Sequence, residues 1–215
     1  MRAVAERLRT LPPVTIYEPE YVEVIAEPTD PNAFDIEHYG STWLVTGVWL
    51  ERLVQTLLKL ITLERDIERR PYEVDTLLDK VRQNTQKSLA DRGVTLIIQS
   101  DDGTLNCNAD LIQSLLINLV DNAAKAYDTD APDKRVFLTF SADTIEVRDF
   151  GRGIPEKAMG CIFEPFYMAD KSRSKKAGGS GLGLALVKRI ADAHDAELTV
   201  KSGVGKGTTV RVHFQ

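Results

Sequence analysis

Hydrophobic residues recur at helical spacing in the segment that precedes Pro71. Between about Thr42 and Arg70, apolar residues stand three and four positions apart and charged residues occupy the other side. This pattern predicts an amphipathic helix over 42–70, ended by the proline. Its apolar stripe consists of Leu50, Leu53, Val54, Leu57, Leu60 and Ile61. The stripe must be buried, either against its own domain or against a second copy of the chain.

After Pro71 the chain alternates between helical and strand-like patterns. We expect helices over 76–91, 110–127 and 183–194. Strands are predicted over 72–74, 94–99, near Leu105, and over 135–140, 144–149, 197–202 and 208–214. The last four strands form two hairpins, and the second of these turns through three glycines at 203, 205 and 207. Hairpins separated by helices predict an α/β (α+β) fold, a two-layer sandwich of a mixed sheet and helices preceded by the long amphipathic helix.

This pattern divides the chain into three parts. Residues 1–41 form a head rich in proline and glutamate, in which the prolines exclude a long helix and favour loop, short strand or disorder. Residues 42–70 carry the amphipathic helix, and residues 71–215 form the alternating domain.

Charge and cysteine content narrow the class of protein. The formal net charge is −5 and no basic stripe is present, which argues against nucleic acid as a partner. No apolar run approaches the roughly 20 residues that span a bilayer, so a membrane enters only if the chain is part of a larger receptor. Cys107 and Cys161 lack metal-ligand spacing and are expected to be free thiols in a reducing compartment. We therefore expect a cytoplasmic protein, or the cytoplasmic part of a membrane sensor.

Two glycine-rich stretches carry the first chemical signal. Residues 149–153 (Asp-Phe-Gly-Arg-Gly) place a carboxylate beside a flexible turn, and residues 178–184 form a second glycine turn that leads into a helix. A purine base needs an acceptor for its exocyclic amine, and a polyphosphate needs backbone N–H groups that no side chain obstructs. Together the two stretches predict a nucleotide site.

The helix predicted over 110–127 adds amide side chains. Asn118 and Asn122 are four positions apart, so they lie one turn above each other on one face, and Lys125 lies one turn further. An amide oxygen suits Mg²⁺ when the phosphates of a nucleotide supply the other ligands. The alternative is that both asparagines only form hydrogen bonds at a helix surface, and the glycine stretches downstream favour the metal.

These motifs resemble those of the sensor histidine kinases, members of the gyrase, chaperone, kinase and mismatch-repair ATPase superfamily. Residues 116–125 are similar to the N box of that family, 149–153 to its G1 box and 163–167 to its F box. Residues 179–183 are similar to its G2 box and 203–208 to its last glycine box. The resemblance covers the chain from about residue 72 to its end. Residues 49–70 more loosely resemble the second dimerisation helix of the family.

The resemblance implies a role for each matching polar residue. Asn122 would coordinate Mg²⁺, and Asn118 and Lys125 would lie near the phosphates of ATP. Asp149 would accept the adenine amine, and Thr208 would support that contact through water.

The resemblance also implies that the glycine boxes enclose the nucleotide. These residues are Gly151 and Gly153 at the base, and Gly179, Ser180, Gly181, Leu182 and Gly183 at the phosphates. The loop between Tyr167 and Gly178 would be a lid over ATP. Many relatives place an arginine at the position of Met168, and Lys171 or Arg173 of the lid would take its catalytic role.

Asn118 indicates transfer of phosphate rather than hydrolysis. Gyrase-type and chaperone-type relatives carry a glutamate at this position as the general base that activates water, and an amide cannot take that proton. The resemblance thus implies the catalytic region of a two-component sensor histidine kinase. It would transfer the γ-phosphoryl group of Mg-ATP to a histidine, for relay to the receiver domain of a response regulator, and a homodimer would form through the helix at 42–70.

The phosphoacceptor has two interpretations. The family carries it as a histidine followed by an acid, on the first of two dimerisation helices. His38 is the only histidine upstream of the nucleotide motifs, and its acid, Glu37, precedes it. His38 is therefore the candidate phosphoacceptor. Alternatively it is an ordinary surface or helix-start residue, and the chain is a nucleotide-binding pseudokinase or regulatory module.

Overall fold

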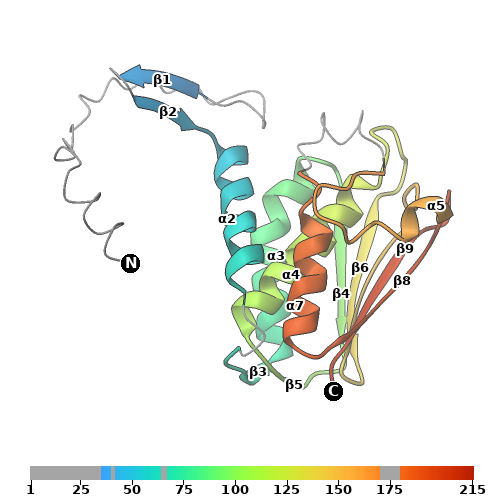
Figure 1. Cartoon of the computed structure of the whole chain (residues 1–215). Coiled ribbons are helices and arrows are strands. Elements are labelled where there is room, and N and C mark those ends of the chain that lie inside the picture. The colour runs from blue at the N-terminus through green and yellow to red at the C-terminus, as the bar shows by residue number, and fades with distance from the viewer. Residues whose placement is uncertain (1–34, 40–41, 64–66, 170–179) are drawn as a thin grey trace. The chain divides into compact units, whose positions relative to one another are not determined.

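The computed structural model describes residues 35–39, 42–63, 67–169 and 180–215 (Figure 1). The predicted head lies outside the described residues up to residue 34. The elements that follow it are β1 (Asp35–Tyr39), β2 (Thr42–Thr46), α2 (Val48–Thr62), β3 (Arg70–Glu73), α3 (Val74–Ala90), β4 (Thr95–Ser100), β5 (Thr104–Cys107), α4 (Ala109–Lys125), β6 (Arg135–Ser141), β7 (Thr144–Asp149), α5 (Glu156–Met159), α7 (Gly183–Ala193), β8 (Glu197–Gly203) and β9 (Gly207–His213).

A five-stranded sheet in the order β4-β6-β7-β9-β8 forms one layer of the fold. β4 and β6 run parallel, and every other neighbouring pair is antiparallel. Helices α3, α4 and α7 cover one face of this sheet (Figure 1). The predicted two-layer sandwich with a mixed sheet is therefore confirmed. β3 and β5 pair separately as a small antiparallel sheet.

The core lies between this sheet and the three helices. Strand β6 alternates buried and accessible residues, with Val136, Leu138 and Phe140 turned inward. Helix α4 buries a stripe of apolar residues against it, among them Leu115, Leu116 and Leu119. Burying each such side chain contributes about 1.5–3 kcal/mol, which ties α4 firmly to the sheet. The helix that carries the N box is thus fixed over the sheet whose strands β7, β8 and β9 carry the start of the G1 box and the two ends of the last glycine box.

The helix predicted over 42–70 is wrong at both ends. Residues 42–46 form β2, which pairs with β1, and the helix spans Val48–Thr62. The run Thr-Trp-Leu-Val-Thr consists mostly of β-branched and aromatic residues, which favour strands. Its pairing with β1 outweighs the helical spacing of its apolar residues. At the other end, the helix stops at Thr62 because Leu63 takes an extended backbone, well before the proline that was predicted to end it. Arg70, which precedes Pro71, begins β3, in line with the extended backbone that a following proline favours.

The apolar residues in and directly after α2 lie in two environments. Leu60 and Leu63 pack against the core. Lys59 donates to Ser114 Oγ at 3.2 Å, and Arg189 donates to the carbonyl oxygen of Leu63 at 2.9 Å. Along another side of the helix, Val54, Leu58 and Ile61 are 45%, 50% and 76% exposed. One side of α2 therefore packs on its own domain, and a second apolar side faces solvent.

Buried His194 connects the end of α7 to the start of α4. Its Nδ1 lies 2.8 Å from the carbonyl oxygen of Ile190 and must donate to it, whereas its Nε2 accepts from the backbone N–H of Asn108 at 3.1 Å. The ring is therefore neutral, and burial lowers its pKa. Asn108 caps α4 by accepting from the N–H of Leu111. These contacts fix α7 relative to α4, the two helices that meet at the site below.

Within the described ranges, we find no helix with the length and apolar content that a bilayer crossing requires.

Candidate functional site

Asp149 ends β7 on the face of the sheet that the helices cover, and it is only 4% exposed. The backbone N–H of Gly151 donates to its Oδ1 at 2.8 Å. Burial raises the pKa of the carboxyl to about 6, and hydrogen bonds from the N–H groups of Gly151 and Thr208, together with Arg152, oppose that shift. A buried carboxylate held at the end of a strand, beside a glycine turn, is a strong candidate for ligand recognition.

Backbone contacts hold the G1 segment between α4 and the last hairpin. The N–H of Arg152 donates to the carbonyl oxygen of Ala126 at 3.0 Å, at the end of α4. On the other side, the N–H of Gly205 donates to the carbonyl oxygen of Arg152 at 2.7 Å. The pairing of β7 with β9 places Asp149 opposite Thr208. Residues predicted to contact the base thus meet at one end of the neighbouring strands β7 and β9, although they lie far apart in sequence.

Asn118 and Asn122 lie directly against the first residue of α7. A Cβ atom built on Gly183 would lie 2.9 Å from Asn118 Oδ1 and 3.6 Å from Asn122 Nδ2. Asn118 Nδ2 donates to the carbonyl oxygen of Ser114 at 2.8 Å, which leaves Oδ1 turned towards α7. The two asparagines share one face, as their spacing predicts, and a side chain at position 183 would displace Asn118 Oδ1 from this approach.

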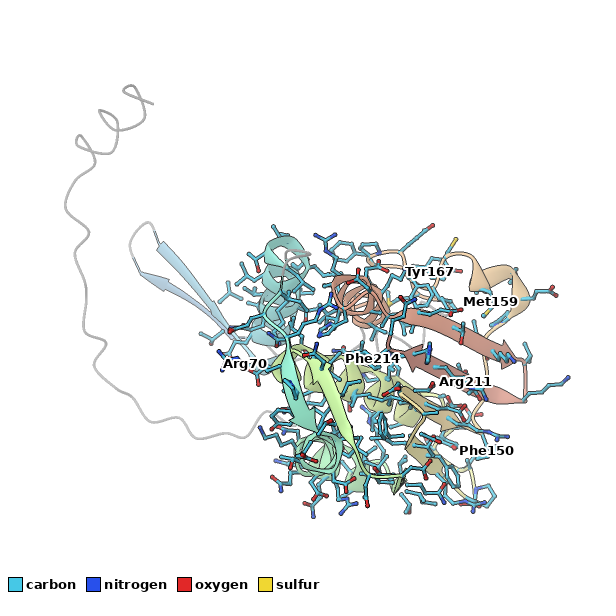
Figure 2. All side chains as sticks on the ribbon, turned by 90° about the horizontal axis from the view of Figure 1, so that it is seen from below. Arg70, Phe150, Met159, Tyr167, Arg211 and Phe214 are labelled. Carbon is cyan, nitrogen blue, oxygen red and sulfur yellow. The ribbon has the colours of Figure 1, made fainter. Side chains whose placement is uncertain are left out.

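The start of α7 has the properties of an anion site. Its first turn carries no acidic side chain. A helix N-terminus presents backbone N–H groups that have no partner within the helix, together with the positive end of the helix dipole, and here it lies beside the two amides. Leu182 is fully buried, and its N–H lies 3.4 Å from Ser180 Oγ. Gly181 accepts from the N–H of Phe166 at 3.0 Å, which joins the F box to the G2 box. Figure 2 labels Tyr167, next to this junction, and Met159 of α5.

Not every predicted residue can be assigned to this grouping. Gly179, Lys171 and Arg173 fall outside the described residues. Lys125 is the last residue of α4, and its carbonyl oxygen accepts from Arg152 at 3.3 Å. His38 lies in β1 opposite Trp43, so the interpretation as a helix-start residue is wrong.

The donor set agrees with a metal held partly by a nucleotide. Among the residues described, no three His, Cys, Asp or Glu side chains gather into a metal cluster. A hard cation beside Asn122 would take phosphate oxygens and water as its other ligands, as Mg²⁺ does in many nucleotide sites.

Two polar residues of this region were not predicted. Tyr127 Oη accepts from the N–H of Phe150 at 2.9 Å and donates to the carbonyl oxygen of Arg135. Ser202 Oγ accepts from the N–H of Ile154 at 2.8 Å. The sequence does contain a sign of the position of Ser202. Leu198, Val200 and Ser202 alternate along β8, so the Ser202 hydroxyl points to the same covered face of the sheet as the two apolar residues.

Known proteins match this chain in sequence and in fold. The sequence profile of the family described as "Histidine kinase-, DNA gyrase B-, and HSP90-like ATPase" matches residues 107–215. The sensor histidine kinase YkoH of Bacillus subtilis is 34% identical over 169 residues, which are 78% of this chain and 37% of that protein. The phosphate regulon sensor protein PhoR of Pseudomonas aeruginosa is 33% identical over 77% of this chain and 38% of its own length. The chain thus spans less than two-fifths of these relatives.

Solved structures share the fold. Full-length ShkA in complex with AMPPNP superposes with a TM-score of 0.62 and 24% identity, over 76% of this chain and 35% of that one. The histidine kinase AdeS of Acinetobacter baumannii gives a TM-score of 0.60 and 20% identity, over 77% of this chain and 79% of that one. At these identities the likeness establishes the fold alone.

Proposed function

Because this chain belongs to the family of histidine kinase-, DNA gyrase B- and HSP90-like ATPases, we propose that it binds Mg-ATP and transfers the γ-phosphoryl group to a histidine side chain. One observation carries the proposal. The two amides of α4 face the acid-free first turn of α7, and the buried carboxylate of Asp149 ends a strand of the sheet that both helices cover.

Each part of the nucleotide has a matching group. Asp149 accepts the amine of adenine, and Thr208 opposite it supports that contact. The N-terminal N–H groups of α7 receive phosphate oxygens. Asn122 is the protein ligand of Mg²⁺, with Asn118 and Lys125 beside the phosphates. From the lid, Lys171 or Arg173 would offset charge at the γ-phosphate.

The chemistry is transfer because the site lacks a base for water at position 118. A neutral imidazole nitrogen of the acceptor attacks the γ-phosphorus while the bond to the β,γ-bridging oxygen breaks. ADP leaves with that electron pair, and the imidazole gives up its proton. Such a reaction depends mainly on positioning and charge stabilisation. The phosphohistidine would then pass its phosphoryl group to an aspartate of a response regulator receiver domain.

A second candidate, a nucleotide-binding regulatory module, is favoured by the positions of the three histidines. His194 is buried with both ring nitrogens hydrogen-bonded, and His213 Nδ1 lies 3.0 Å from Thr144 Oγ1 on β7. His38, the candidate phosphoacceptor, lies on a strand rather than on a helix. If the chain is instead a kinase, we propose that the acceptor is either His38 or a histidine supplied from outside this chain.

Labelling with γ-labelled ATP separates these two functions. The kinase proposal expects acid-labile phosphate on this chain or on a separately supplied histidine phosphoacceptor domain. His38→Ala tests transfer within the chain, and its label should disappear if His38 is the acceptor. Binding of ATP without label on either protein would eliminate the kinase in favour of the regulatory module.

Asn122→Asp should weaken Mg-ATP binding by about tenfold or more, because the added charge repels the phosphates that share the metal. Calorimetry at saturating Mg²⁺ measures this. Asn84→Asp is the matched control, since it makes the same substitution at an exposed asparagine inside another helix, α3. Equal affinities for the two variants would contradict the metal role of Asn122.

We also propose that α2 forms a homodimer through its exposed apolar side. Leu58→Glu combined with Ile61→Glu would place charges in that interface and dissociate it. Sedimentation should show the wild-type chain at twice 23.9 kDa and the variant at that mass. Gln55→Glu adds a charge to an exposed position beside the stripe and should leave the dimer intact. A monomeric wild-type chain would overturn this proposal.

We place the protein in the cytoplasm. Its proposed substrate is ATP, and a reducing compartment suits Cys107 and Cys161, which are both free thiols in the structure.

A further inference from the structure

The covered face of the sheet changes from apolar to polar at one cross-strand row. Across β7, β9 and β8, the row Ile145, Val212, Leu198 is apolar, and so is the next row Val147, Val210, Val200. The third row is Asp149, Thr208, Ser202. Directly opposed residues of antiparallel strands point to the same face, so these three polar side chains form one line at the nucleotide end of the sheet.

Ser202 uses its whole hydrogen-bonding capacity within this region. Its Oγ accepts from the N–H of Ile154 at 2.8 Å and lies 2.8 Å from the carbonyl oxygen of Gly207. A carbonyl only accepts, so the single proton of the Ser202 hydroxyl belongs to that bond. The remaining neighbour is Thr208 Oγ1 at 3.0 Å. Since Ser202 has no second proton, Thr208 must donate its own proton to Ser202.

These two hydrogen bonds fix the direction of the Thr208 hydroxyl proton. With its proton directed to Ser202, the Thr208 oxygen keeps only acceptor lone pairs. The Asp149 carboxylate beside it is also an acceptor. Hence the third row offers two acceptors and no side-chain donor to a ligand. Without Ser202, the Thr208 hydroxyl could turn and direct its proton towards the ligand instead.

We propose that Ser202 is a positioning residue. By fixing the direction of the Thr208 hydroxyl proton, it makes the site bind a 6-amino purine in preference to a 6-oxo purine. Adenine presents a donor, its amine, to this pair of acceptors, and in this proposal the Thr208 oxygen accepts from the amine directly instead of through the water that the family resemblance implies. Hypoxanthine and guanine present a carbonyl oxygen at the same place, which would face two acceptor oxygens, and the nearest donor that they offer is the N1–H, one ring position away. This inference rests on the proposed binding of a nucleotide and goes beyond it, because it assigns the selectivity to a residue that does not contact the base.

The test compares the affinities of ATP and inosine triphosphate, whose bases differ at position 6, an amine against a carbonyl oxygen, and at N1, an acceptor against an N–H donor. We expect the wild-type chain to bind ATP about 100-fold more tightly than inosine triphosphate. Ser202→Ala should narrow that ratio by about tenfold, chiefly by improving the binding of inosine triphosphate. Ser202→Thr keeps the hydroxyl on a strand that accepts β-branched residues, so it should preserve the ratio.

A double-mutant cycle separates positioning from general stabilisation. Thr208→Val removes the hydroxyl whose direction is at issue and should narrow the ratio as Ser202→Ala does. Adding Ser202→Ala to Thr208→Val should then change nothing further, because the serine acts through the threonine. An unchanged ratio in Ser202→Ala, or additive effects of the two substitutions, would overturn the inference while the binding of ATP stands. A wild-type chain that binds neither nucleotide would instead overturn the proposed function, and this inference with it.

Discussion

Gly207→Ala should destabilise the chain by more than about 4 kcal/mol, whereas Gly205→Ala, two residues earlier, should cost only about 1 kcal/mol. Both glycines have a left-handed backbone, with φ of +76° at Gly207 and +72° at Gly205. That conformation alone costs a residue with a side chain about 1–2 kcal/mol. The difference between the two variants comes from the space around each position.

A Cβ atom at Gly207 would lie 2.1 Å from the carbonyl oxygen of Asp149 and 2.7 Å from the Cα atom of Phe150. Both are backbone atoms at the end of β7, held by the pairing of β7 with β9, so they cannot move aside without breaking that ladder. At Gly205, a Cβ atom would meet nothing within 4 Å. Only the substitution at Gly207 therefore forces the sheet apart.

Urea unfolding at a fixed pH measures both variants. If both unfold in a single transition with the slope of the wild-type chain, their midpoints give the two free energies directly. A total stability of roughly 5–15 kcal/mol leaves Gly207→Ala marginally folded at best. Equal costs at the two positions would contradict the tight contact between the last glycine box and the G1 segment.

The regular elements after Pro71 were predictable because their periodicity agrees with their environment. Helix α4 has one side facing the core, and β6 alternates around Val136 and Leu138, so local pattern and tertiary packing give the same answer. Residues 42–46 were assigned wrongly because a strand of that composition needs a partner, and β1 is not recognisable before the pairing is seen. The short helix α5 is a single turn, too short to show a period.

The site was only partly predictable for a different reason. The spacing of Asn118 and Asn122 gives their shared face, but nothing local shows that Gly183 packs against them. That contact depends on how α4 and α7 pack, and the buried contact between His194 and Asn108 contributes to it. From sequence, only the family resemblance indicates that Asn118, Asn122 and Gly183 come together. Ser202 and Tyr127 carry no such motif, and their roles emerge only from hydrogen bonds between distant strands and turns.

Asp149→Asn should weaken ATP binding by about 100-fold or more and remove most of its dependence on pH. The amide is nearly isosteric, but its nitrogen is a donor where the adenine amine also needs an acceptor. A hydrogen bond to a charged group contributes about 1.5–3 kcal/mol, and a buried donor left facing another donor adds to the loss. Calorimetric titration with Mg-ATP measures the effect.

The pH profile follows from the raised pKa of the Asp149 carboxyl, which is about 6 against an ordinary value of 3.8. Because the folded pKa is the higher one, this group stabilises the fold fully only below about pH 3.8, and the contribution is lost as the pH rises through about 6. ATP affinity has the opposite trend, since the ionised carboxylate is the better acceptor. It should fall about tenfold from pH 7 to about pH 5 in the wild-type chain and stay nearly level in Asp149→Asn.

Glu146→Gln is the matched control for this variant. Glu146 lies on the same strand, turned to the uncovered face, and it pairs there with Arg211, which Figure 2 labels. Removing its charge should leave both the affinity for ATP and its pH profile unchanged, because the sheet separates it from the helices and the nucleotide. If Asp149→Asn bound ATP as Glu146→Gln does, adenine would have to be recognised elsewhere, and the buried carboxylate would be a structural residue of the turn that Gly151 begins.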